Sequence, residues 1–260
     1  MRLSLYSTLF LLGFRTELRL FVATMIRSTF LLLLLFIFSR LWALILPDGL
    51  SMPQLLWYFL ITELIMISTP RVYLRMERDI SDGTFAVLIQ KPINYATTRI
   101  AESLGVLLGR LPSFVTLGAT GTLFFTGEVP AGLRSPFALI IAFLLIYLAA
   151  SVLTISYAII GLCSAFLRDT RTLSMVWDKG VWLLGGLMVP IILYPPWLQQ
   201  IAPWTPFYYL LFGVAQIALN GVTVVCIHTA IALCLWGAFG MVLVGLLQRK
   251  IASDIIGEGG

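Results

Sequence analysis

Residues 180–248 read GVWLLGGLMVPIILYPPWLQQIAPWTPFYYLLFGVAQIALNGVTVVCIHTAIALCLWGAFGMVLVGLLQ, a stretch without a formal charge between Lys179 and Arg249. A helix that crosses the hydrocarbon core of a membrane needs about 20 apolar residues, so this stretch is too long for one span. Five prolines between positions 190 and 206 also interrupt it, because proline breaks the interior of a helix. We therefore expect two spans joined by an apolar helical hairpin over residues 195–217 that dips back into the membrane.

The composition of the whole chain agrees with a membrane location. Of 260 residues, 60% are hydrophobic and 11% are charged, whereas soluble domains carry about 25% charged residues. The apolar runs, such as residues 31–38, are continuous and do not alternate with polar residues as barrel strands do. Helices satisfy their own backbone hydrogen bonds in lipid. The sequence therefore predicts an all-α membrane protein with a single transmembrane domain over residues 1–260.

Hydrophobic runs and charge placement give the expected topology. Residues 1–21 have apolar positions near helical spacing among charges, which predicts an amphipathic interface helix. The basic residues gather before the first span, after the second, after the fourth and after the sixth, which places both termini in the cytoplasm and the hairpin outside. We predict six transmembrane helices, near residues 22–46, 53–69, 100–125, 137–166, 180–194 and 221–247.

Three ionisable residues fall within or beside the spans, namely Glu63, Glu102 and Arg110. Such residues are costly at membrane depth and often mark a transport path, but a structural Glu–Arg pair between helices is the other interpretation. The only histidine, His228, has no acidic neighbour in the sequence, and no glycine-rich phosphate-binding motif is present. We therefore expect no catalytic residue, no metal site and no cofactor bound by this chain, which is not an enzyme on this interpretation.

A second informative segment is the predicted cytoplasmic loop at residues 71–99. It contains alternating charges, a turn at Asp82-Gly83 and then an apolar run. Apolar residues in such a loop indicate burial against lipid headgroups or against a partner protein, and charges beside them would give a docking surface its register. The candidate docking residues are Glu77, Asp79, Ile80, Asp82, Gly83, Phe85, Val87 and Leu88.

The two segments carry motifs in a defined order. The loop reads DISDGTFAVLIQKP at residues 79–92, and the charge-free stretch contains GGLMVP at 185–190, PPWL at 195–198 and PWTPFYY at 203–209. Together with length, span number and topology, these motifs resemble the ABC-2-type permease family, the membrane subunits of ATP-driven exporters. The resemblance covers nearly the whole chain.

This resemblance implies a role for each segment. The loop would contain the coupling helix that sits in a groove of a cytosolic ABC ATPase, present in two copies, which would bind the ATP and Mg. A second permease, the same or a related chain, would complete the transporter, with the path between the two copies. The outer end of the path would be an uncharged gate formed by Pro190, Pro196, Trp197, Trp204, Pro206 and Phe207.

An uncharged aromatic gate suits a hydrophobic or amphiphilic substrate, such as a drug, a lipid or a lipid-linked glycan, because an ionic substrate would need charges along its path. The expected location is a prokaryotic inner (plasma) membrane, with membrane lipids and the transporter subunits as partners and no nucleic acid. The alternative interpretation is a proton-coupled secondary carrier that uses Glu63 and Glu102.

Overall fold

The computed structural model describes residues 2–47, 49–89, 93–167 and 169–257, and within these ranges every regular element is helical. The all-α expectation is confirmed for this part of the chain. The α-helices are α1 (Arg2–Arg19), α2 (Phe21–Leu44), α3 (Met52–Ser68), α4 (Val72–Ser81), α5 (Thr84–Ile89), α6 (Tyr95–Thr126), α7 (Pro136–Cys163), α8 (Arg171–Gly185), α9 (Pro196–Ile201), α10 (Pro206–Leu210), α11 (Phe212–Asn220) and α12 (Val224–Gly257), and the 3-10 helices are η1 (Ala131–Leu133), η2 (Ile191–Leu193) and η3 (Ala202–Trp204).

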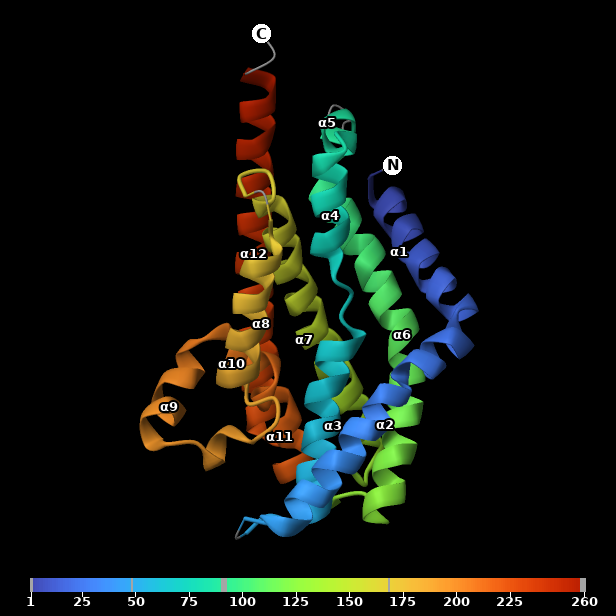
Figure 1. Ribbon diagram of the computed structural model, residues 1–260, viewed down its shortest axis with the longest axis vertical. Coiled ribbons are helices and arrows are strands. Elements are labelled where there is room, and N and C mark those ends of the chain that lie inside the picture. Colours follow the sequence, from blue (N-terminus) through green and yellow to red (C-terminus); the bar gives the residue numbers. More distant parts are fainter. Residues whose placement is uncertain (1, 48, 90–92, 168, 258–260) are drawn as a thin grey trace.

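Five helical segments of the described chain are long and apolar enough to cross a membrane: α2, α3 continued by α4, α6, α7 and α12. This is the pattern of a multi-pass membrane protein. In Figure 1 the start of α1, the helix α5 and the end of α12 lie at one end of the bundle, which we call the charged end. The turn between α2 and α3 and the end of α6 lie at the other, which we call the opposite end.

The N-terminal helix α1 packs along the first half of α6 (Figure 1). Two glycines of α6, Gly105 and Gly109, have the spacing of small residues that lets membrane helices approach closely. A methyl group added at Gly105 would overlap the carbonyl oxygen of Phe10, and one at Gly109 would lie 2.8 Å from the Cβ atom of Glu17. The α1 backbone therefore rests on the surface that these glycines leave open.

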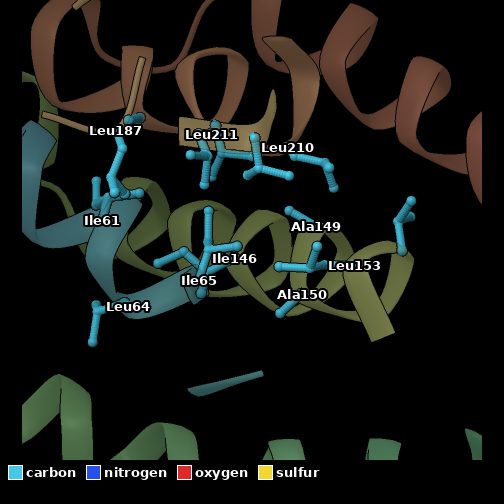
Figure 2. Packing of buried hydrophobic residues seen from close by; sticks show 14 of the residues in the cluster. Ile61, Leu64, Ile65, Ile146, Ala149, Ala150, Leu153, Leu187, Leu210 and Leu211 are labelled. Atoms are coloured by element: carbon cyan, nitrogen blue, oxygen red, sulfur yellow. The ribbon is translucent and has the colours of Figure 1, made fainter. Parts of the chain in front are cut away.

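The centre of the bundle is formed by α3 and α7 with the turn after α8 and the segment around Leu211. Figure 2 shows Ile65 of α3 and Ile146 of α7 side by side, with Leu187 above Ile61. These side chains are all at most 3% exposed. Since α3 is buried along nearly its whole length, it is the central helix around which the others are arranged.

Local sequence signals explain several helix ends. Ser51 and Gln54 form a reciprocal capping box at the start of α3. The side chains of Asn94 and Ser135 accept backbone hydrogen bonds at the starts of α6 and α7. Gly127, with φ of +74°, ends α6 in the left-handed conformation that glycine adopts most easily.

The prediction of one continuous span over residues 180–194 is wrong. The helix α8 begins earlier, at Arg171, and ends at Gly185, because Gly186 adopts φ of +69° and its N–H caps the helix on the carbonyl of Trp182. Fifteen residues of helix rise about 22 Å, which is short of the roughly 30 Å hydrocarbon core. The six-span count therefore stays a prediction.

Three other predicted boundaries also move. The helix α6 begins at Tyr95, ahead of the expected start at residue 100, and α12 continues to Gly257, well past residue 247. The predicted hairpin over residues 195–217 consists of α9, η3, α10 and most of α11, with the last of these ending at Asn220. In Figure 1, α9 projects from the side of the bundle, away from the other helices.

Candidate functional site

The α4–α5 segment at the charged end is a folded unit on the surface of the bundle. Tyr73 and Met76 of α4 are buried against α7, where a methyl group at Gly161 would come within 2.9 Å of the Met76 Cβ atom. The chain then turns at Gly83, whose φ is +78°. The Asp82 carboxylate accepts a hydrogen bond of 3.0 Å from the Thr84 N–H, and this bond lowers the pKa of Asp82 below 3.8. The turn and the start of α5 are thus fixed by local chemistry.

A network of charges attaches α4 to α6. The Asp79 carboxylate lies 2.6 Å from a guanidinium nitrogen of Arg99 and accepts a hydrogen bond of 2.6 Å from the Tyr95 hydroxyl. Glu102 lies 2.6 Å from Arg75 and 3.4 Å from Arg99. The two carboxylates and two guanidinium groups alternate across the helix interface, so α4 and α6 are held in one register.

A second set of polar contacts attaches α4 to the helices that follow it in the chain. The Thr170 hydroxyl donates a hydrogen bond of 2.6 Å to Glu77. Arg71 lies 3.2 Å from Asp178 of α8, and the same carboxylate accepts a hydrogen bond of 2.6 Å from the Tyr157 hydroxyl of α7. Displacing α4 would therefore pull directly on α7 and α8. Sequence reasoning missed Asp178, Thr170 and Tyr157, which lie about 100 positions from α4 and carry no motif.

The structure divides the predicted docking residues into two groups. Phe85 is only 2% exposed and its ring meets that of Tyr95 edge to face at 4.9 Å, so the expectation of an exposed apolar side chain there is corrected: Phe85 packs within the chain. Glu77 and Asp79 likewise bond to other helices of the chain. Of the predicted docking residues, Asp82, Gly83 and Val87 are exposed, while Ile80 and Leu88 are half-buried.

The last residue of the loop motif, Pro92, lies outside the described residues. Residues of the motif up to Leu88 can be placed, and they form α4, the turn and α5. The described part of the motif thus consists of the end of α4, a turn and α5, with one face buried and the other exposed.

A groove of about 550 Å³ runs beside α4 and is closed on its far side by the segment between α7 and α8. Its lining combines apolar, acidic and basic side chains, and Leu74 and Leu167 are partly exposed. We call it the α4 groove. It is lined by Leu74, Glu77, Arg78, Ile80, Ser81, Ser164, Leu167 and Arg171.

The three ionisable residues expected near the spans have separate environments. Arg110 donates two hydrogen bonds of 2.8 and 3.0 Å to one oxygen of Glu17, so it pins α1 to α6. Glu102 belongs to the network at the charged end. Glu63 is 7% exposed in the middle of α3, and among the described residues no hydrogen bond or ion pair engages it. The structure therefore gives Arg110 and Glu102 structural ion pairs and leaves Glu63 apart from both.

The predicted outer-gate residues do not converge on one point. Phe207 packs edge to face on Trp177 of α8 at 4.9 Å, and Pro190 is buried. In contrast, Trp204 is 86% exposed and Trp197 is also largely exposed, on the side of the projecting α9. Exposed tryptophans of this kind are typical of the interface between membrane and water.

The turn after α8 is held by the central helix. The hydroxyl of Tyr58 donates a hydrogen bond to the carbonyl of Gly186, and the hydroxyl of Thr62 donates one of 2.8 Å to the carbonyl of Leu187. All four residues are buried. Two side chains of α3 thus satisfy backbone groups that the end of α8 leaves without helical partners.

Comparison with protein-family models and with curated proteins gives no match for this chain.

Proposed function

We propose that this chain is the permease subunit of an ATP-driven exporter, and that the exposed face of the α4–α5 segment together with the α4 groove receives a cytosolic ABC ATPase. The observation that carries the proposal is the bonding of α4. Its outer face is exposed, while its inner face packs on α7 and is joined by charged and hydroxyl groups to α6 and to the start of α8 and its Asp178. A force applied to α4 from outside would be passed to several helices at once, which is what a coupling element needs.

The distribution of basic residues supports the orientation in this proposal. All Lys and Arg residues except Arg40, Arg110 and Arg134 belong to segments assigned to one side. Of these segments, the start of α1, α4 and the end of α12 lie at the charged end in Figure 1, while α1 runs from there toward the middle of the bundle. By the preference of basic residues for the cytoplasmic side, the charged end faces the cytoplasm and the hairpin faces outside. The inner membrane of a prokaryotic cell is the location that the resemblance to the permease family implies.

The fifth of the six spans in this proposal includes α8. Because α8 alone is short, it would cross the membrane together with the turn at Gly186 and the η2 segment, with the helices α9 to α11 re-entering from the far side. The path would lie between two permease copies. Its uncharged aromatic end favours a hydrophobic or amphiphilic substrate.

The test of ATPase docking uses Val87, which is 61% exposed on α5. In Val87→Asp, we expect loss of the co-purifying ABC ATPase from native membranes while the unfolding temperature of the purified chain stays unchanged. Phe85→Ala is a poor probe, since it removes a buried ring and would loosen the loop itself.

The matched control is Val224→Asp, a similarly exposed valine at the start of α12 near the opposite end. An acidic residue in the first turn of a helix is favourable, so this variant should retain the ATPase. Retention of the ATPase by Val87→Asp, or its equal loss in both variants, would contradict docking at the α4–α5 segment.

A proton-coupled carrier is the second candidate, and the observation in its favour is that Glu63 is buried without a hydrogen bond or ion pair to any other residue that the structure describes. Glu102, the other acidic residue of that proposal, already forms ion pairs with Arg75 and Arg99 at the charged end. To separate the carrier from the exporter, transport by wild type and by Glu63→Gln is measured at a series of external pH values in vesicles without ATP. A carrier would lose its pH dependence, whereas the exporter would show no transport in those vesicles with or without the substitution.

A further inference from the structure

A cavity of about 510 Å³ lies between α3, α6 and α7 near the opposite end of the bundle. It is separate from the α4 groove and from the hairpin. Its walls come from residues 57–64 of α3, 115–123 of α6 and 139–146 of α7, and the segment 129–134 crosses its end. All its lining side chains except Arg134 are apolar or aromatic.

The cavity opens toward the surroundings of the bundle between α6 and α7. Leu123 near the end of α6 and Leu139 near the start of α7 both line it and are partly exposed. The three helices that form its walls are all long and apolar enough to cross a membrane. The opening therefore faces the lipid, at a depth just below the headgroups.

Neither water nor empty space suits this cavity. A buried water needs two to four polar partners, and the walls offer almost none because the one indole N–H at hand, that of Trp57, already donates to the carbonyl of Glu128 at 3.2 Å. An empty cavity forfeits the dispersion contacts of every side chain that lines it. The acyl chains of the bilayer lie directly at the opening and can fill it.

Two charged residues lie at the end of the cavity where a lipid headgroup would be. Arg134 and Glu128 are 3.4 Å apart, and more than half of each side chain is exposed. The Arg134 guanidinium also donates to the carbonyl of Val129 at 3.1 Å, which fixes its direction. A cation and an anion held side by side complement a headgroup that carries a phosphate and an ammonium group.

We propose that this cavity is a binding site for a resident zwitterionic phospholipid. One acyl chain lies between α3, α6 and α7, the phosphate contacts Arg134 and the ammonium group contacts Glu128. The site is independent of the proposed export function, since it requires neither the ATPase nor a substrate.

The tail is tested by photolabelling of the full chain in nanodiscs of phosphatidylethanolamine and phosphatidylglycerol. The probe is a phosphatidylethanolamine with a photoactivatable diazirine on one acyl chain, and adducts are mapped by peptide mass spectrometry. We expect the adducts to concentrate on residues 57–64, 115–123 and 139–146. Adducts no denser there than on the exposed face of α12 would overturn the proposal.

Two variants fill the cavity from different walls, Ala119→Phe from α6 and Ala142→Leu from α7. Each should lose most of the adducts on the cavity walls, and the second keeps the test decisive if the first fails to fold. The matched control is Ala238→Phe on the exposed side of α12, which should leave the adducts unchanged. Unchanged wall labelling in a folded filled variant would also overturn the proposal.

The headgroup is tested with the same label on phosphatidylglycerol, which lacks the ammonium group. The wild-type chain should label more strongly with the phosphatidylethanolamine probe. Glu128→Gln should remove that preference while wall labelling persists, and Arg134→Gln should weaken labelling by both probes. If wild type and Glu128→Gln showed the same preference for one probe over the other, the assignment of the ammonium group to Glu128 would be overturned.

Discussion

At the charged end, carboxylates of α4 and α6 meet guanidinium groups and hydroxyls, whereas at the turn after α8, two hydroxyls of α3 meet backbone carbonyls. The first arrangement depends on side chains from both partners. In the second, each hydrogen bond needs only one side chain, because its acceptor is a backbone carbonyl that every residue possesses. The charged end is therefore fixed by ion pairs and responds to the loss of either partner, while the turn after α8, at the centre of the bundle, is fixed by polar groups without charge.

The largest effect is expected from breaking the central charge pair of α4 and α6. In Asp79→Ala, Arg99 is left without its closest partner although its side chain is only 15% exposed. Arg99 then keeps only its longer contact of 3.4 Å with Glu102, and removal of one partner from a largely buried pair costs at most about 3–5 kcal/mol of folding free energy. The free energy of unfolding in detergent, followed by circular dichroism, measures this loss.

The control for that prediction is Arg134→Ala, which breaks an ion pair whose side chains are both more than half exposed. Exposed pairs contribute about 1 kcal/mol or less. If Asp79→Ala were as mild as this control, the charge network would not hold α4 to α6.

The second prediction concerns the uncharged anchor. Tyr58→Phe and Thr62→Val each leave a buried carbonyl without its side-chain donor, at a cost of about 1–3 kcal/mol per group, and the double variant should exceed either single one. Amide hydrogen exchange should rise over residues 186–191 in particular. Thr120→Val is the control, because its hydroxyl bonds only to carbonyls of its own helix, and an equal rise in that variant would contradict the anchor.

The third prediction concerns the contact between α1 and α6, which combines an ion pair with close backbone packing. Gly105→Ala places a methyl group against the carbonyl of Phe10, so α1 must shift, and we expect a loss of about 1–3 kcal/mol. Gly245→Ala is the matched control, since open space surrounds that position in α12. Alanine there should raise the free energy of unfolding by about 0.5–1 kcal/mol. Equal effects of the two substitutions on the unfolding free energy would refute the close approach.

The smallest effect is the pH dependence of the turn before α5. Because the folded-state pKa of Asp82 is lowered below 3.8 by the Thr84 N–H, its contribution is present above that value and is lost as the pH falls through the lower folded-state pKa. Exchange of the Thr84 amide should therefore accelerate in this acidic range, and Asp82→Ala should show the faster rate already at neutral pH. A pH-independent ratio between the two proteins would contradict this.

The sequence predicted the parts of the fold that depend on neighbouring residues. Continuous apolar runs located α2, α3 and α7 to within a few residues, since a span in lipid requires them. The end of α8 is not predicted because Gly185 and Gly186 fall inside the expected span at residues 180–194, and only the left-handed conformation of Gly186 reveals the break.

The directions of side chains were harder to predict than the helices. Phe85 and Val87 are two positions apart in one apolar run, yet the first packs on Tyr95 and the second is exposed. Their difference depends on where α6 lies, which no local pattern contains. The pair of Glu17 with Arg110 joins residues 93 positions apart for the same reason.

The anchoring of the turn after α8 has a consequence for how the chain can change over time. Tyr58 and Thr62 hold the carbonyls of Gly186 and Leu187, and every amino acid has a carbonyl. The exposed side chain of Met188 can therefore be exchanged without releasing the anchor, while Gly186 is constrained by its backbone angle and Leu187 by its burial. Position 188 is a place where new side chains can be tried at little risk to the fold.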